Sequence, residues 1–170
     1  MKHLYFVRHG LSIMNKQGFY SGRTETPLAA EGLEQVHQAG KDLQDKQVDC
    51  IVTSPMKRAV DTAHIIAEEI GFPIDKIIVS DLFMERDFGP LEGTVYSADT
   101  HLDTHKGVEH SNELVARSQK GLDYLKTLPA DTILVVSHGA VGRALQHLLQ
   151  KTPSFRETDR FENAKVVKLL

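Results

Sequence analysis

The sequence predicts an α/β protein with three layers, in which helices cover both faces of a mostly parallel sheet. Short runs that are apolar at nearly every position recur at 4–7, 48–53, 77–79, 132–136 and 166–170, as expected for strands buried on both faces. Stretches with apolar residues at helical spacing separate most of these runs. This alternation is typical of parallel strands joined by crossover helices. At 170 residues, the chain has the length of a single domain, which we expect to span 1–170.

Helices and loops are predicted between the strands. The predicted helices share apolar residues three or four positions apart and lie at 31–46, 54–70, 109–128 and 139–150. Ser54 and Pro55 are typical of an N-cap and a first helical position, and Gly71 fits the residue just past a helix end. The polar segment 12–25 and the irregular segment 81–107 are expected to be loops.

Composition and charge exclude several classes of protein. Lysine and arginine number 20 against 23 aspartates and glutamates, and the net charge of −3 argues against general affinity for nucleic acid or anionic membranes. The single cysteine, Cys50, excludes an internal disulfide and a thiolate metal cluster, and its apolar neighbours predict burial. No stretch reaches 18 apolar residues and the N-terminal apolar run is too short for a secretion signal, so we expect a cytoplasmic protein.

Charged and titratable residues follow several of the predicted strands. Arg8 and His9 end the first strand, Arg58 lies one turn into the helix after the second, Glu85 follows the third, and His138 follows the strand at 132–136. Because ligands of such sheets bind beyond the carboxyl ends of the strands, we expect these side chains to converge at one edge.

These residue types suit the transfer of a phosphoryl group. Arginine offers a planar fork of donors that matches phosphate oxygens, and the helix N-terminus after His138 adds backbone donors. Histidine can attack phosphorus near neutral pH, while a carboxylic acid can protonate the leaving oxygen and later activate water. The arginines can neutralise the developing charge, so the chemistry requires no metal.

Five motifs in order resemble those of the histidine phosphatase superfamily, the phosphoglycerate mutase-like proteins, and most closely its short phosphatases. A strand followed by Arg-His-Gly alone would be a weak signal, but the resemblance spans nearly the whole chain. The segments that carry it are LYFVRHG at 4–10, TPLAAEG at 26–32, SPMKRAVDTA at 54–63, MERDFGPLEG at 84–93 and VVSHG at 135–139. The resemblance implies the phosphoglycerate mutase-like fold, with a small insert at about 94–111.

The resemblance also implies a role for each matching residue. His9 would be the nucleophile that becomes phosphorylated, and Glu85 the proton donor and then the base for water. The substrate-binding residues would be Arg8, Arg58, His138, Asn15 and Gly139. It implies a metal-independent phosphomonoesterase acting on a small phosphate ester, with no cofactor, as a monomer or homodimer.

Two departures from the family pattern are visible. Ala29 and Ala30 stand where relatives usually carry a polar residue and a threonine, which removes a side-chain helix cap. The segment 108–111 replaces a Gly-Glu-Ser segment on the substrate side.

Three other functions stay open. Phosphoglycerate mutase activity is disfavoured by the short segment after Gly93, because a small cap admits water. Glu85 disfavours a protein phosphohistidine phosphatase, because phosphohistidine is already a good leaving group and needs no proton donor. The complete set of core residues disfavours a non-catalytic phosphate-binding module. His101, His105 and His110 also leave a zinc site open, although the segment lacks cysteine and a helical pattern.

Overall fold

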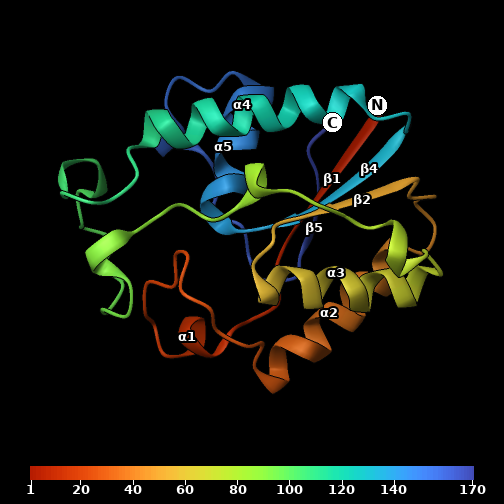
Figure 1. Ribbon diagram of the computed structural model, residues 1–170, viewed down its shortest axis with the longest axis horizontal. Helices are drawn as coiled ribbons and strands as arrows, with labels where there is room; N and C mark the ends of the chain where they lie inside the picture. Colours follow the sequence, from red (N-terminus) through yellow and green to blue (C-terminus); the bar gives the residue numbers. More distant parts are fainter.

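The computed structural model, which describes residues 1–170, has a five-stranded sheet at its centre (Figure 1). The strand order is β3-β2-β4-β1-β5. The strands span His3–Arg8 (β1), Cys50–Thr53 (β2), Ile78–Val79 (β3), Thr132–Ser137 (β4) and Val166–Lys168 (β5). All neighbours pair in parallel except β1 and β5, which are antiparallel. The predicted three-layer α/β class is therefore confirmed.

Helices cover both faces of the sheet (Figure 1). Helices α2 (Ala30–Leu43) and α3 (Lys57–Ile70) pack together on one face, and α4 (Ser111–Thr127) and α5 (Gly139–Gln150) on the other. A fifth helix, α1 (Ile13–Lys16), is a single turn inside the segment predicted to be a loop. No helix has the length and apolar character needed to cross a membrane.

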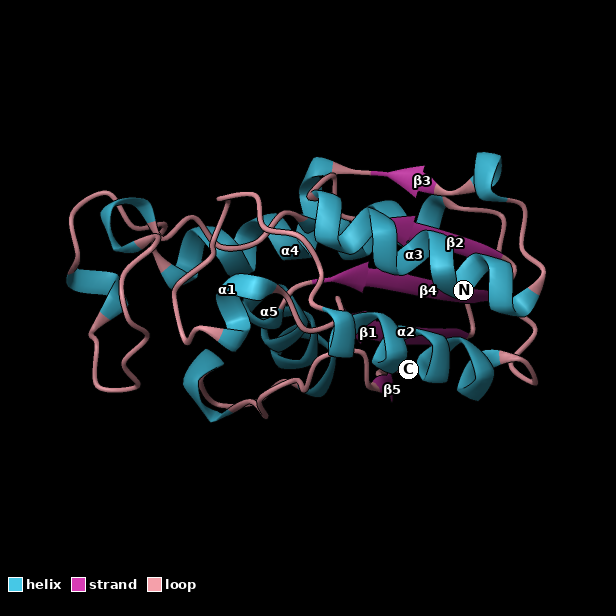
Figure 2. Ribbon diagram, turned by 90° about the horizontal axis from the view of Figure 1, so that it is seen from below, coloured by secondary structure: helices cyan, strands magenta, loops and turns pink.

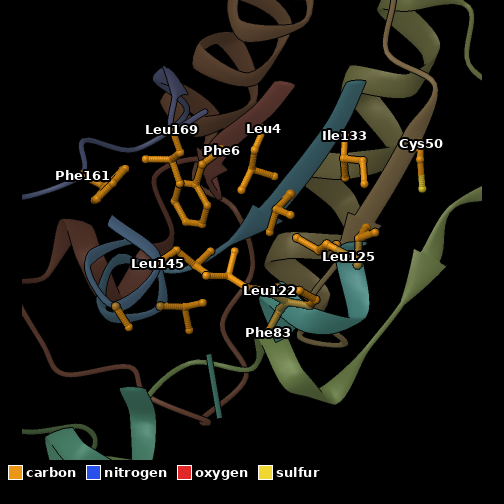
Figure 3. Close-up of a cluster of buried hydrophobic side chains, with 14 of the residues drawn as sticks. Leu4, Phe6, Cys50, Phe83, Leu122, Leu125, Ile133, Leu145, Phe161 and Leu169 are labelled. Carbon is orange, nitrogen blue, oxygen red and sulfur yellow. The ribbon is translucent and has the colours of Figure 1, made fainter. Parts of the chain in front are cut away.

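The alternation of side chains along the strands fills two separate cores. Leu4 and Phe6 of β1 belong to the cluster beneath α4 and α5 (Figure 3). Val7 of the same strand belongs to the cluster beneath α2 and α3. Strand β4 divides in the same way, with Ile133 in the first cluster and Leu134 in the second. Because successive side chains point to opposite faces of the sheet, a strand that is apolar at every position contributes to the core on both faces.

Helix α3 begins later than predicted. Its N-cap is Met56, not Ser54, and its first helical residue is Lys57. The Ser54 hydroxyl accepts the Met56 N–H two residues on, so it stabilises the turn that leads into the helix. Ala29 is the N-cap of α2 and makes no side-chain cap bond, consistent with the departure noted in the sequence.

The longest connections lie at one end of the sheet (Figure 2). They include α1, which follows the carboxyl end of β1, and the segment between β3 and α4, which contains only short 3₁₀ turns. Because β5 is antiparallel, the residues that precede it also reach this end: Asn163 forms a bridge with Arg8. Segments distant in the sequence therefore surround the carboxyl edge of β1 and β4.

Candidate active site

A cavity of about 400 Å³ opens at the carboxyl edge of the sheet. Six of the seven predicted site residues line it, namely Arg8, His9, Asn15, Arg58, Glu85 and Gly139. The seventh, His138, is fully buried and does not line the cavity, but its ring centroid lies 5.1 Å from that of His9. The structure thus brings all seven together: the strand-end argument predicts the convergence of Arg8, His9, Arg58, Glu85 and His138, and the resemblance adds Asn15 and Gly139.

His9 is held in one tautomer. Its Nδ1 lies 2.7 Å from the Gly10 carbonyl oxygen, which can only accept, so Nδ1 carries the hydrogen and Nε2 keeps its lone pair. Burial lowers the pKa of His9 well below its usual 6.5, and the Arg58 and Arg8 guanidinium groups lower this pKa further. The ring is therefore neutral at neutral pH, and the lone pair on Nε2 accepts a hydrogen bond from Arg58 Nε in this structure.

Two guanidinium groups flank this imidazole, that of the buried Arg58 and that of the half-buried Arg8. Arg58 is completely buried on the first turn of α3; its Nε donates to His9 Nε2 at 3.2 Å, and its Nη2 donates to the Gly22 carbonyl at 2.6 Å. Arg8 donates from Nη1 to the Phe161 carbonyl at 2.9 Å, while its Nε is buried without a partner. The loop carbonyls fix both forks without neutralising them, so the positive charge remains available to an anion.

Glu85 supplies the carboxyl group. One of its oxygens accepts the Arg86 N–H at 2.8 Å and the other accepts the Ala140 N–H of α5 at 3.5 Å. Burial raises the pKa of Glu85 above its usual 4.5, although the Arg86 N–H and the two guanidinium groups counteract this rise. A raised pKa favours the protonated form, which is the form that can donate to a leaving oxygen.

The second imidazole, His138, has one bonded and one unbonded nitrogen. Its Nε2 lies 2.7 Å from Ser54 Oγ, and Ser54 Oγ already accepts the Met56 N–H. His138 Nε2 is the only acceptor that the Ser54 hydroxyl hydrogen meets, so donation from Ser54 Oγ to Nε2 satisfies both groups and places the His138 hydrogen on Nδ1. That Nδ1 is buried without a protein partner. Buried donors without a hydrogen-bond partner are rare in proteins, yet this site contains two of them, Arg8 Nε and His138 Nδ1.

Gly10 is required by a close approach of two elements. A Cβ at this position would lie 2.6 Å from Val36 Cγ2 and 2.7 Å from the Gly32 carbonyl oxygen of α2. A Cβ on Gly32 would in turn lie 2.2 Å from the Leu11 carbonyl oxygen. The two glycines let the loop after His9 lie directly on α2, which fixes the backbone that carries the imidazole.

Asn163 is a site residue that sequence reasoning missed. Its amide Nδ2 donates to the His9 carbonyl at 2.9 Å and to Asn15 Oδ1 at 3.4 Å. The Ser12 N–H also faces Asn15 Oδ1, at 3.5 Å, so donors surround the oxygen of Asn15 and its NH₂ group is left free. The direction of β5 was the missing signal: an antiparallel last strand brings the residues before it to the carboxyl edge.

The outer wall of the cavity was also missed. It comes from the segment after β3, from α5 and from the segment that follows α5, and includes Tyr96, Arg143, Phe155 and Arg160. Nothing in a single sequence indicates which loop residues point inward.

The three histidines of the 94–111 segment do not gather. The structure contains no cluster of three or more His, Cys, Asp or Glu side chains arranged to hold a metal ion. His110 instead is the N-cap of α4, where its Nδ1 accepts the Asn112 N–H at 3.2 Å.

The chain thus falls in the class of mostly parallel α/β proteins with a cavity at the carboxyl edge of the sheet, and guanidinium and imidazole groups surround that cavity here. Within that class, the chain belongs to the histidine phosphatase superfamily (branch 1), whose family model matches residues 4–170. It is a phosphoric monoester hydrolase, as its membership and its phosphatase-named relatives indicate.

Known proteins similar to this chain include phosphatases and mutases. A Bacillus subtilis relative, named "Uncharacterized phosphatase PhoE", is 38% identical over 143 residues, which cover 82% of this chain and 72% of the relative. A 2,3-bisphosphoglycerate-dependent phosphoglycerate mutase of Parvibaculum lavamentivorans is 36% identical over 92 residues, covering 53% of this chain and 44% of the mutase. The structure of a mycobacterial glucosyl-3-phosphoglycerate phosphatase shares the fold, with a TM-score of 0.87, 23% identity, and coverage of 99% of this chain and 92% of that one.

Proposed function

We propose that this chain hydrolyses small phosphomonoesters through a phosphohistidine on His9, without a metal ion or another cofactor. The observation that carries the proposal is the tautomer of His9. Its Nδ1–H bond to the Gly10 carbonyl leaves a lone pair on Nε2, and this atom lies beside Arg58 in a cavity that Glu85 also lines. A nucleophile, positive charge and an acid thus meet in one place.

In the first step, the lone pair of His9 Nε2 attacks phosphorus and forms the N–P bond. The P–O bond to the alcohol breaks in line, and protonated Glu85 transfers its proton to the departing oxygen. Arg8 and Arg58 balance the charge on the phosphoryl oxygens, and the unpaired Nδ1–H of His138 and the free NH₂ of Asn15 supply neutral donors. The N–H groups at the start of α5, after Gly139, favour the same anion.

In the second step, ionised Glu85 takes a proton from water as the water oxygen attacks phosphorus. The N–P bond breaks and its electron pair returns to His9 Nε2. The products are inorganic phosphate and neutral His9, and Glu85 has recovered its proton. The same carboxyl group therefore serves as acid and then as base, which suits a pKa raised toward neutrality by burial.

The test is turnover of p-nitrophenyl phosphate by the wild-type protein and by His9→Ala. Loss of the nucleophile is expected to lower kcat at least about a thousandfold. The matched control is His37→Ala, because His37 is an exposed histidine of α2 bonded to Glu69, and it is expected to keep wild-type turnover. Turnover by His9→Ala at the wild-type rate would exclude the mechanism, and inhibition by a chelator that added metal reverses would exclude metal independence.

The intermediate is tested with Glu85→Gln. Since p-nitrophenolate leaves without a proton, this variant is expected to form the phosphoenzyme but to hydrolyse it slowly. Acid-labile phosphate should accumulate on His9 and be found there by peptide mapping. Its absence under single-turnover conditions would contradict a covalent intermediate.

Mutase activity is the second candidate because proteins named as phosphoglycerate mutases or probable ones match between 53% and 98% of this chain. Conversion of 3-phosphoglycerate to 2-phosphoglycerate with the bisphosphate primer, compared with phosphate release from the same substrate, separates the two reactions. We expect phosphate release to exceed isomerisation.

A further inference from the structure

A second cavity, of about 520 Å³, adjoins the first. It lies against the segment 97–103, at the end of the molecule where the long connections extend (Figure 2). The residues that line both cavities are Tyr20, Arg86, Tyr96, Leu102, Arg143, Phe155 and Arg160. The two cavities therefore lie next to each other, and the side chains of this shared wall face both of them.

The second cavity is rich in arginine. Arg86, Arg143, Arg156 and Arg160 line it, against the carboxylates of Asp99 and Asp103. Asp103 is already committed, since it accepts from Arg86 Nη2 at 2.6 Å and from the hydroxyl and the N–H of Ser111 at 2.8 Å each. These bonds outweigh burial and lower the pKa of Asp103 to about 2, so its charge balances that of Arg86.

Two of these guanidinium groups have no acidic partner. Arg160 makes no hydrogen bond or salt bridge, and its guanidinium carbon lies 5.8 Å from the centre of the Tyr96 ring. Arg143 donates only to neutral oxygens, namely Thr158 Oγ1 at 2.9 Å and the carbonyls of Phe155 and Arg156 at 3.3 and 3.2 Å. These bonds use Nε and Nη2 and leave Nη1 free.

The aromatic rings keep these cations in the shared wall. Arg143 lies 5.0 Å from the centre of the Phe155 ring, much as Arg160 lies over Tyr96. A guanidinium group stacked on a ring keeps its N–H edges available for a planar or tetrahedral anion. Burial lowers the pKa of Arg143, and the positive charge of the neighbouring Arg160 lowers it further.

We propose that the second cavity binds an anionic group, a carboxylate or a second phosphate, carried by the alcohol part of the substrate, and that Arg160 and Arg143 recognise it. This inference rests on the proposed hydrolysis at His9 and adds the class of ester: the alcohol that leaves is itself an acid. The observation behind it is that two cations without acidic partners, Arg143 and Arg160, line both the cavity that contains His9 and the second cavity.

The experiment uses two matched series of esters. One series comprises ω-phosphooxy alkanoates of increasing chain length, and the other the corresponding primary amides, which have nearly the same size but no charge. The readout is the ratio of kcat/KM for acid over amide at each length. We expect wild-type protein to prefer the acid at one or two lengths by about tenfold, the effect of one partly exposed charge-assisted hydrogen bond. Alkanediol bisphosphates of the same lengths show whether carboxylate or phosphate fits better.

Arg160→Gln is expected to reduce the acid-over-amide ratio to near one, and Arg160→Glu to invert it. Lys120→Gln is the control, because Lys120 is an exposed cation of α4 outside both cavities and its substitution makes the same change in net charge. It should keep the wild-type ratio.

Absence of an acid preference at every length, while both series are hydrolysed, would overturn the inference and leave the proposed function standing. Equal loss of both substrates in Arg160→Gln would also overturn it, because a structural defect does not distinguish acid from amide. Failure of the wild-type protein to hydrolyse either series, or p-nitrophenyl phosphate, would overturn both proposals.

Discussion

Substitution of Gly10 by alanine tests whether the contact between the loop and α2 positions the nucleophile. The added methyl group would lie 2.6 Å from Val36 Cγ2 and 2.7 Å from the Gly32 carbonyl oxygen, about an ångström inside ordinary contact distances. The valine can move, but the carbonyl belongs to the backbone of α2 and cannot move without that helix. We therefore expect a loss of about 3 kcal/mol in the free energy of unfolding, at the upper end for overpacking.

The same clash should displace His9, whose Nδ1–H bond ends on the Gly10 carbonyl. A misplacement of about 1 Å at a reacting atom costs roughly a hundredfold in rate, so kcat/KM for p-nitrophenyl phosphate should fall by about that factor in the protein that remains folded. Urea unfolding and steady-state kinetics measure the two effects.

Gly139→Ala is the control for stability. A methyl group there would meet nothing closer than the Arg8 side chain, at 3.6 Å, so we expect its unfolding free energy to stay within about 1 kcal/mol of wild type. The double variant Gly10→Ala/Val36→Ala should not regain wild-type activity, because the Gly32 carbonyl remains in place. Wild-type stability and turnover in Gly10→Ala would refute the reasoning, and full rescue by the double variant would show that the backbone contact is unimportant.

Three further predictions concern polar groups of the site. Burial raises the pKa of Glu85, so ionising this carboxyl group costs more free energy in the folded protein than in the unfolded chain. We therefore expect Glu85→Gln to increase the free energy of unfolding in urea by about 1 kcal/mol at pH 8 and by less at pH 4. A variant that is no more stable than wild type at pH 8 would contradict this. Burial lowers the pKa of His138, so the unfolded chain binds a proton there more readily than the folded protein, and the free energy of unfolding should fall as the pH drops below about 6.5. If His138→Gln showed the same change of unfolding free energy with pH as wild type between pH 7.5 and 5.5, this prediction would be refuted. Asn163→Asp should lower kcat/KM more than Asn163→Ala, because a carboxylate at this position would face two acceptor oxygens, those of the His9 carbonyl and of the Asn15 side chain. The reverse order in steady-state assays would show that Asn163 does not act as a hydrogen-bond donor.

The capping of α3 shows where local sequence rules were insufficient. Ser54 followed by Pro55 has the local features of an N-cap and a first helical residue, yet the helix starts two residues later. The Ser54 hydroxyl instead bonds both to the Met56 N–H and to His138 Nε2. His138 lies far away in the sequence, between β4 and α5. A long-range partner thus decides the boundary that local propensity alone assigned wrongly.

The alternation of apolar runs and helical spacing was sufficient to predict the layers and the convergence of Arg8, His9, Arg58, Glu85 and His138. This follows because strands buried on both faces must be covered by helices, and parallel strands bring their carboxyl ends to one edge. The tertiary structure alone decided that β5 runs antiparallel, so that Asn163 reaches the His9 carbonyl, and that two arginines of the outer wall lack acidic partners. Strand direction and loop conformation depend on contacts between residues far apart in the chain, which no local pattern records.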